Sequence, residues 1–269
     1  MPRPCWICEA PADSREHKIK RSDLVREFGA DAFRDEGGLL HFIDGQPPRE
    51  LQGPNSKRLK YEPVLCGDCN SARSQPWDRA YETFIAWVFD NQRVVLSRRY
   101  INLCEVFGEE GAVESCPNLY KYFVKAFGCR LASAGYTVPA HLVTLLSQDY
   151  FLTKLRLTFA VYKAVFALAT ELRQRAGLGD LIRLDSRSMG QMERYFFQLN
   201  VGWLVIGLHY DIEAPPGVGA CWTSDSACIY LGEIEGPTLD ELIECARRDN
   251  APALAELEAL RDSGGIRIE

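Results

Sequence analysis

The chain has 269 residues, of which 46% are apolar and 25% are charged, a composition ordinary for a folded protein in water. No uncharged apolar run approaches the roughly 18 residues that a membrane span needs, and the N-terminus lacks the apolar stretch of a secretory signal. A cytoplasmic protein with no membrane partner is therefore expected. The formal net charge is −6, but residues 1–79 balance 13 Lys and Arg against 13 Asp and Glu, so the negative excess belongs to the remainder.

The cysteines predict a metal site near the start of the chain. Four of the ten cysteines form two Cys-x-x-Cys pairs, Cys5 with Cys8 and Cys66 with Cys69. A two-residue gap lets both sulfurs of a pair bind one ion, and four thiolates complete a closed tetrahedral zinc site. We therefore predict a structural zinc that joins two distant segments. The other six are expected to be small buried apolar residues: Cys104, Cys116, Cys129, Cys221, Cys228 and Cys245.

Residues suited to hydrolytic chemistry stand next to both cysteine pairs. Glu16 and His17 follow the first pair, and Asn70 directly follows the second. A neutral imidazole accepts a proton from water near pH 7. Carboxylate and amide oxygens suit magnesium or manganese. The zinc would therefore bring a base and two oxygen ligands close together.

This order of residues resembles the HNH endonucleases, in the branch whose ββα-metal core is held by a four-cysteine zinc. The resemblance covers about the first 85 residues, including the run from Ser71 to Asp78. It implies that His17 is the general base and that Glu16 and Asn70 hold one catalytic Mg²⁺ or Mn²⁺ ion. The family's third histidine is absent, and Asp78 stands about where it would fall, so Asp78 is the expected third ligand. A solvated helix edge is the alternative for Asp78 and the favoured one for Glu82, an optional extra ligand.

Basic residues group around this motif. Neutralising phosphates needs local positive charge and not a basic total, so the grouping favours contacts with DNA phosphates. An ordinary solvated surface is the alternative for any single one of them. The predicted nucleic-acid-binding residues are Lys18, Lys20, Arg21, Lys57, Arg58, Lys60, Arg73 and Arg79.

The elements expected in the first part follow the motif. Residues 16–19 are expected to form a short strand that presents His17. Residues 22–28 are expected to form a helix capped by Ser22 and ended by Gly29. Residues 30–63 read as an insertion with a strand at 39–43, where His41 is expected to be an ordinary residue. After Pro76, apolar residues recur at helical spacing and predict one buried face. These are Trp77, Ala80, Tyr81, Phe84, Ile85 and Val88.

The second part reads as helices followed by strands. Residues 91–140 are expected to form short helices and loops, and residues 142–176 a long helix that is buried from Leu155 to Ala169. The period then changes to that of strands, at 195–201, 203–210 and 227–234. A closing helix is expected over 238–262, opened by the capping box of Thr238 and Glu241.

Together these features predict an α+β fold in two parts: a zinc-stapled ββα-metal nuclease module in residues 1–90, and a helical domain with a small antiparallel sheet in residues 91–269. The second part resembles no known family and is expected to serve target recognition, dimerisation or regulation. The expected function is metal-dependent hydrolysis of DNA in a defence or mobile-element context, with a regulatory protein or a second copy as further partner. The missing histidine and the acidic total keep open an alternative, a catalytically inactive zinc-ribbon-like adaptor that binds nucleic acid or protein.

Overall fold

The computed structural model describes residues 3–31, 33, 40–41, 49–148, 154–162, 176–178, 181–185, 193–211 and 220–234, with isolated positions between 240 and 258. The helices are α1 (Arg21–Phe28), α2 (Gln75–Asp90), α3 (Gln92–Arg98), α4 (Leu103–Phe107), α5 (Glu109–Ser133), α6 (Ala140–Leu145) and the 3-10 helix η1 (Lys57–Leu59). The strands are β1 (Leu40–His41), β2 (Arg49–Glu50), β3 (Tyr100–Asn102), β4 (Leu155–Tyr162), β5 (Ala176–Leu178), β6 (Ile182–Asp185), β7 (Glu193–Val201), β8 (Leu204–Tyr210), β9 (Cys221–Trp222) and β10 (Cys228–Ile234). The α+β class predicted from the sequence is confirmed.

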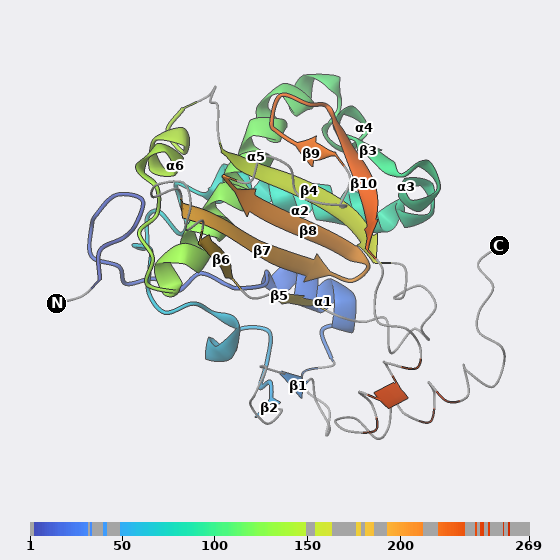
Figure 1. Cartoon of the computed structure of the whole chain (residues 1–269), viewed down its shortest axis with the longest axis horizontal. Coiled ribbons are helices and arrows are strands. Elements are labelled where there is room, and N and C mark those ends of the chain that lie inside the picture. Colours follow the sequence, from blue (N-terminus) through green and yellow to red (C-terminus); the bar gives the residue numbers. More distant parts are fainter. Residues whose placement is uncertain are drawn as a thin grey trace.

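A mixed sheet forms one layer and helices α2 and α5 lie behind it (Figure 1). Eight strands take part, in the order β3-β10-β4-β8-β7-β5, while β6 pairs with β7 and β9 pairs with β4. The pairing of β10 with β4 is parallel and the other described pairings are antiparallel. The sheet is therefore larger than expected and is not purely antiparallel.

The β7–β8 hairpin confirms two of the three predicted strands. Val201 pairs with Leu204 across a two-residue turn, and Gly202 in that turn has a φ of 52°. Positive φ at the first turn residue suits glycine and matches the twist of a tight hairpin. The third predicted strand, at 227–234, is confirmed as β10.

The predicted long helix over 142–176 is wrong at its centre, because Leu155–Tyr162 is strand β4. Six of its eight residues are buried. A strand inside a sheet and covered on both faces reads as a continuous apolar run, which periodicity cannot tell from a buried helix. Helix α6 occupies the start of the predicted range, and residues 163–175 lie outside the described part of the chain.

The central buried helix is instead α5, within the range expected to hold only short helices and loops. It has 25 residues and carries Phe123 and Phe127 on the side that faces the sheet. Phe123 packs edge-on against Phe159 of β4, with ring centroids 5.9 Å apart. Phe127 stacks on Phe197 of β7 at the same centroid distance. Aromatic pairs of this geometry fix a helix on a sheet. Helices α3 and α4 are the short elements that the sequence did indicate.

The strand expected at residues 16–19 is not a regular strand, because His17 forms only an isolated bridge with Lys60 on an extended segment that precedes α1. Backbone bonds join Tyr61 N to Glu16 O at 2.9 Å and Lys18 N to Leu59 O at 2.7 Å, so residues 14–18 run antiparallel to 59–65. Helix α2 buries all six residues predicted for its apolar face.

Two smaller elements agree only in part with the sequence. Gly29 ends α1 with a φ of 82°, as predicted. Ser22 does not cap this helix, because the last residue with extended dihedrals is Lys20 and Ser22 lies in the first turn. The strand expected at 39–43 is observed at Leu40–His41. Thr238 and Glu241, the expected capping box, lie outside the described residues.

One buried apolar cluster runs across the expected boundary at residue 90. Phe84 of α2 packs edge-on against Phe159 of β4, with centroids 5.9 Å apart, and both are buried in the same cluster as Cys5 and Cys69. The cysteine turns and α2 are therefore packed onto the helix and sheet of the second part. None of the helices within the described residues has the length and apolarity to cross a membrane.

Candidate functional site

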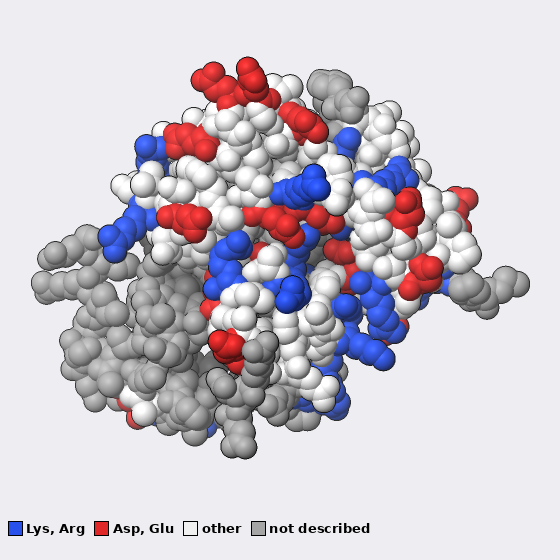
Figure 2. Space-filling view, turned by 180° about the vertical axis from the view of Figure 1, so that it is seen from behind, with Lys and Arg blue, Asp and Glu red and all other residues white. Residues whose placement is uncertain are grey.

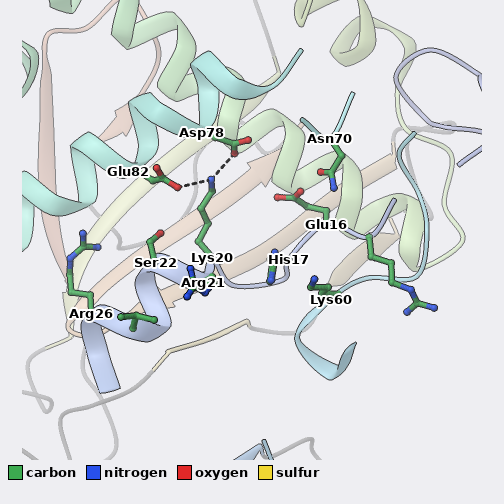
Figure 3. Close-up of a pocket in the computed structure, with 12 residues that line it drawn as sticks. Glu16, His17, Lys20, Arg21, Ser22, Arg26, Lys60, Asn70, Asp78 and Glu82 are labelled. Carbon is green, nitrogen blue, oxygen red and sulfur yellow. Dashed lines mark hydrogen bonds and ion pairs between the residues drawn. The ribbon is translucent and has the colours of Figure 1, made fainter. Parts of the chain in front are cut away.

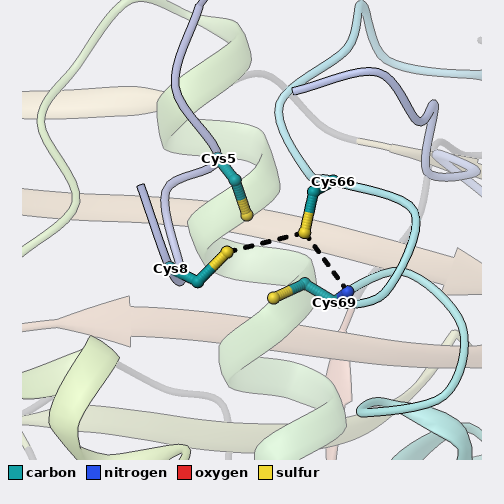
Figure 4. A group of neighbouring side chains, drawn as sticks. All are labelled: Cys5, Cys8, Cys66 and Cys69. Atoms are coloured by element: carbon teal, nitrogen blue, oxygen red, sulfur yellow. Dashed lines mark hydrogen bonds between the residues drawn. The ribbon is translucent and has the colours of Figure 1, made fainter. Parts of the chain in front are cut away.

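The four paired cysteines meet at one point (Figure 4). The sulfurs of Cys5, Cys8, Cys66 and Cys69 all lie within 4.8 Å of one another. Tight turns aim them there: Glu9 N donates to Cys5 O at 2.8 Å, and the amide of Cys69 points at the sulfur of Cys66. Four converging thiols from two turns match the ligand set of a structural zinc. The group could therefore hold a structural metal such as zinc, as the spacing predicted.

Beside the extended segments lies a pocket of about 870 Å³ (Figure 3). Glu16, His17, Asn70 and Asp78 all line it. Glu16 and His17 come from the first extended segment, Asn70 from the turn after the second cysteine pair, and Asp78 from the first turn of α2. The structure thus brings together the four residues singled out for catalysis. Glu82, one turn further along α2, lines the same pocket.

Part of the predicted basic set faces this pocket. Lys20, Arg21 and Lys60 line it, together with Arg15 and Arg26, which the sequence did not single out. Arg15 forms a two-pronged pair with Glu62, with N–O distances of 3.1 and 2.8 Å.

The remaining predicted basic residues lie elsewhere. Lys57, Arg58 and Arg79 are exposed, and the ammonium of Lys18 donates to Arg58 O at 3.2 Å. Arg73 points at Cys69 Sγ and donates to Ser147 Oγ at 2.8 Å, so it belongs to the surroundings of the cysteine cluster. Basic side chains stand among acidic ones on the face opposite to that of Figure 1, so positive charge there is interleaved with negative charge (Figure 2).

Two lysines bind the carboxylates of the pocket. Lys20 Nζ lies 2.9 Å from Asp78 Oδ1 and 3.3 Å from Glu82 Oε1. Lys125 Nζ, from α5, lies 3.0 Å from Asp78 Oδ1 and 3.3 Å from Glu16 Oε1. Sequence reasoning missed Lys125, although a single charged residue inside the apolar run Tyr122 to Phe127 was a usable signal.

Burial and these lysines set the charge of the carboxylates in opposite ways. Burial raises the pKa of Glu16, and the attraction of Lys125 offsets this only in part. Burial alone would also raise the pKa of Asp78, but Lys125 and Lys20 together bring that pKa below its ordinary value. Loss of solvent disfavours the charged form of an acid, and a nearby cation favours it. Asp78 is therefore the more firmly ionised of the two.

His17 is poised as a neutral imidazole. Burial lowers its pKa, and the positive charges of Lys60, Lys20 and Arg21 lower it further, while a hydrogen bond with Asn55 acts the other way. Its Nε2 atom is buried and has no hydrogen-bond partner within the described residues. A neutral ring nitrogen accepts a proton near neutral pH when a water molecule comes within hydrogen-bond reach of it.

Asn70, which lines the pocket, has one amide oxygen without a hydrogen-bond partner among the described residues. Its Nδ2 donates to Ser14 Oγ at 2.9 Å, which fixes the orientation of the amide, and its Oδ1 is buried without a partner in the described structure. A buried polar atom left unpaired is costly, so this oxygen calls for a partner such as a water molecule or an ion. Asn70 Oδ1 and the carboxylate oxygens of Glu16 and Asp78 are hard donors, the type of ligand that magnesium and manganese prefer.

Comparisons with protein-family models, with curated proteins and with solved structures find no match to this chain. The chemistry of the pocket is therefore the basis on which a function is inferred.

Proposed function

We propose that this protein is a metal-dependent endonuclease of the HNH type that hydrolyses DNA phosphodiester bonds. One observation carries the proposal. His17, Glu16 and Asn70, from segments more than fifty residues apart, line one pocket beside a four-cysteine cluster. Residues 14–18 pair antiparallel with residues 59–65 through isolated bridges, and α2 follows the second of these segments, an order of parts similar to that of a ββα-metal core.

His17 would act as the general base. A phosphodiester resists attack because the water must lose a proton while negative charge builds on phosphorus. With its pKa held down by burial and by Lys60, the imidazole is neutral near pH 7 and its unpaired Nε2 accepts the proton. Hydrogen bonding with Asn55 keeps the ring oriented.

Glu16 and Asn70 would hold the catalytic ion, with Asp78 as the further carboxylate of the group. A bound Mg²⁺ or Mn²⁺ ion supplies Lewis acidity to the phosphate oxygens. The zinc expected at the four cysteines has no open position and would serve only to hold the two segments. Arg21 and Lys60 line the same pocket and would bind phosphates of the DNA, whereas the Lys20 ammonium is held by Asp78 and Glu82.

The experiment is a cleavage assay on a panel of nucleic acids. The zinc-loaded chain is incubated with Mg²⁺ or Mn²⁺ and with supercoiled plasmid, linear duplex, single-stranded DNA and RNA. We expect ion-dependent cleavage of DNA, and a loss of at least about 100-fold in His17→Ala, because general-base catalysis contributes that much. His141→Ala is the control, since His141 lies on α6 and does not line the pocket. Intact substrates with wild type, or equal cleavage by His17→Ala, would refute the proposal.

A second candidate function follows from the lysines in the pocket. Because Lys20 and Lys125 already bind Asp78, Glu16 and Glu82, the same geometry suits a catalytically inactive, zinc-stapled adaptor that binds nucleic acid or protein. DNA that is bound but left intact at every ion concentration, with no divalent ion retained near Glu16, would favour this candidate over the nuclease.

A further inference from the structure

Lys125 occupies an unusual position beneath the pocket. Its side chain is 1% exposed and its ammonium contacts Glu16 Oε1 at 3.3 Å and both oxygens of Asp78, at 3.0 and 3.2 Å. Ser74 Oγ lies 3.3 Å from the same nitrogen. An ammonium has three donors, and here they are directed at the oxygens that the proposed catalytic ion would need.

The position of this ammonium is set by the fold and not by the pocket. Lys125 lies between Val124 and Ala126 on α5, one turn after Lys121, on a helix whose neighbouring aromatic residues are fixed against the sheet. Its apolar stem is enclosed, so the charged end has little room to leave. Lys20 approaches the same carboxylate from α1's entry, with its side chain 14% exposed, and so is freer to move.

The charges decide what these lysines do to an incoming cation. Asp78, Glu16 and Glu82 carry up to three negative charges, and the two ammoniums that contact them carry two positive charges. A divalent ion that enters therefore meets carboxylates whose charge is already largely neutralised, and like charges a few ångströms apart repel strongly where water is scarce.

We propose that Lys125, assisted by Lys20, is a built-in counter-cation that positions Glu16 and Asp78 and weakens the binding of a divalent cation by these carboxylates. The inference rests on the proposed metal site. It makes Lys125 a positioning residue, which acts through the two carboxylates and does not touch the substrate. It also explains how the same oxygens can face lysines and still bind a metal ion: the ion would compete with the two ammoniums for these oxygens.

The test measures Mn²⁺ binding directly, by the loss of the free-ion electron paramagnetic resonance signal, without nucleic acid. Lys125→Gln removes the charge and keeps a hydrogen-bond donor, and Lys125→Met keeps the length of the stem. We expect each to bind Mn²⁺ at least about tenfold more tightly than wild type, because one opposing charge is gone from the site. Lys20→Gln, at a more exposed position and therefore safer for folding, is expected to bind more tightly by a smaller factor. Lys154→Gln is the control and is expected to leave the affinity unchanged, because the Lys154 ammonium pairs with Asp211 at 3.3 Å and neither residue lines the pocket.

The outcomes separate this inference from the function on which it rests. One outcome overturns the inference and leaves the metal site in place. In this outcome the wild type binds Mn²⁺, Glu16→Gln does not, and none of the lysine variants (Lys125→Gln, Lys125→Met and Lys20→Gln) binds it more tightly than the wild type. Absence of Mn²⁺ binding in all of these proteins overturns both. Binding that emerges only when a lysine is neutralised supports the inference.

Discussion

The indole of Trp6 lies directly against Gly128, so that the first cysteine turn is packed onto helix α5. A methyl group added at Gly128 would stand 2.5 Å from Trp6 Cη2 and closer still to Cζ2. Carbon atoms do not approach to that distance without overlap. The glycine thus makes room for the aromatic ring that joins the cysteine cluster to the rest of the molecule.

Gly128→Ala should therefore displace Trp6 and destabilise the protein. We expect a loss of about 1–3 kcal/mol in the free energy of unfolding, the usual cost of overpacking a buried contact. Urea denaturation of the zinc-loaded protein measures it. Gly111→Ala is the control on the same helix, where the nearest atom to the new methyl is Phe107 Cβ at an ordinary 3.8 Å. It should be neutral or stabilising by up to about 1 kcal/mol, and equal losses in both variants would show that the contact with Trp6 is not what matters.

The cysteine cluster should bind one zinc ion per chain. Elemental analysis of the purified protein is expected to give a stoichiometry of one, and Cys66→Ser is expected to lose the ion and to lower the unfolding free energy by several kcal/mol, because zinc binding is coupled to folding. The expectation that Cys221 is buried is wrong, because its side chain is exposed and lies outside the cluster, so Cys221→Ser should retain the zinc. Full zinc content in Cys66→Ser would contradict the assignment.

The buried carboxyl of Asp23 should make stability depend on pH. Tyr81 Oη donates to its Oδ2 at 2.8 Å, yet burial raises the pKa of Asp23 to about 6. A carboxyl whose pKa is raised by folding favours the folded state while it is protonated, and this contribution is lost as the pH rises through about 6.

Asp23→Asn removes the titrating carboxyl, so comparison with wild type gives its contribution to the pH dependence of stability. The free energy of unfolding of the variant, relative to wild type, should rise by about 1 kcal/mol between pH 5 and pH 7.5. Denaturant unfolding of the zinc-loaded proteins at the two pH values checks this. A difference that stays flat, or that shrinks as the pH rises, would mean that Asp23 is not held in its protonated form by burial.

The neighbours of His17 should set the acid side of the pH–rate profile. Because a base must be deprotonated to act, cleavage is expected to fall as the pH drops through the pKa of His17, which burial and Lys60 hold below its ordinary value. Lys60→Gln removes one of these positive charges, so the acid limb should move to higher pH. Lys57→Gln, on the exposed helix η1 and away from the pocket, should leave it in place. If the acid limb stays at the same pH in Lys60→Gln, a group other than His17 is the base.

The spacing of apolar residues in the sequence was enough to predict the elements that have one buried and one exposed side. The apolar face of α2 could be predicted because its buried residues recur at helical spacing against an exposed opposite side, and the cysteine pairs carry their geometry in their spacing. Strand β4 could not, since a strand buried on both faces has no polar side to reveal its period. For Lys125, the local sequence shows an isolated charge, but its partners Glu16 and Asp78 lie more than forty residues away and only tertiary packing brings them together.

The placement of a divalent ion tests the central claim most directly. Crystals of the zinc-loaded protein soaked in Mn²⁺ would show the ion by its anomalous scattering. We expect one manganese peak in the pocket, at a coordination distance of about 2.0–2.3 Å from a carboxylate oxygen of Glu16 and from Asn70 Oδ1. A manganese peak only at other sites, or none with the pocket lysines still bound to Glu16 and Asp78, would contradict a metal-dependent nuclease centre.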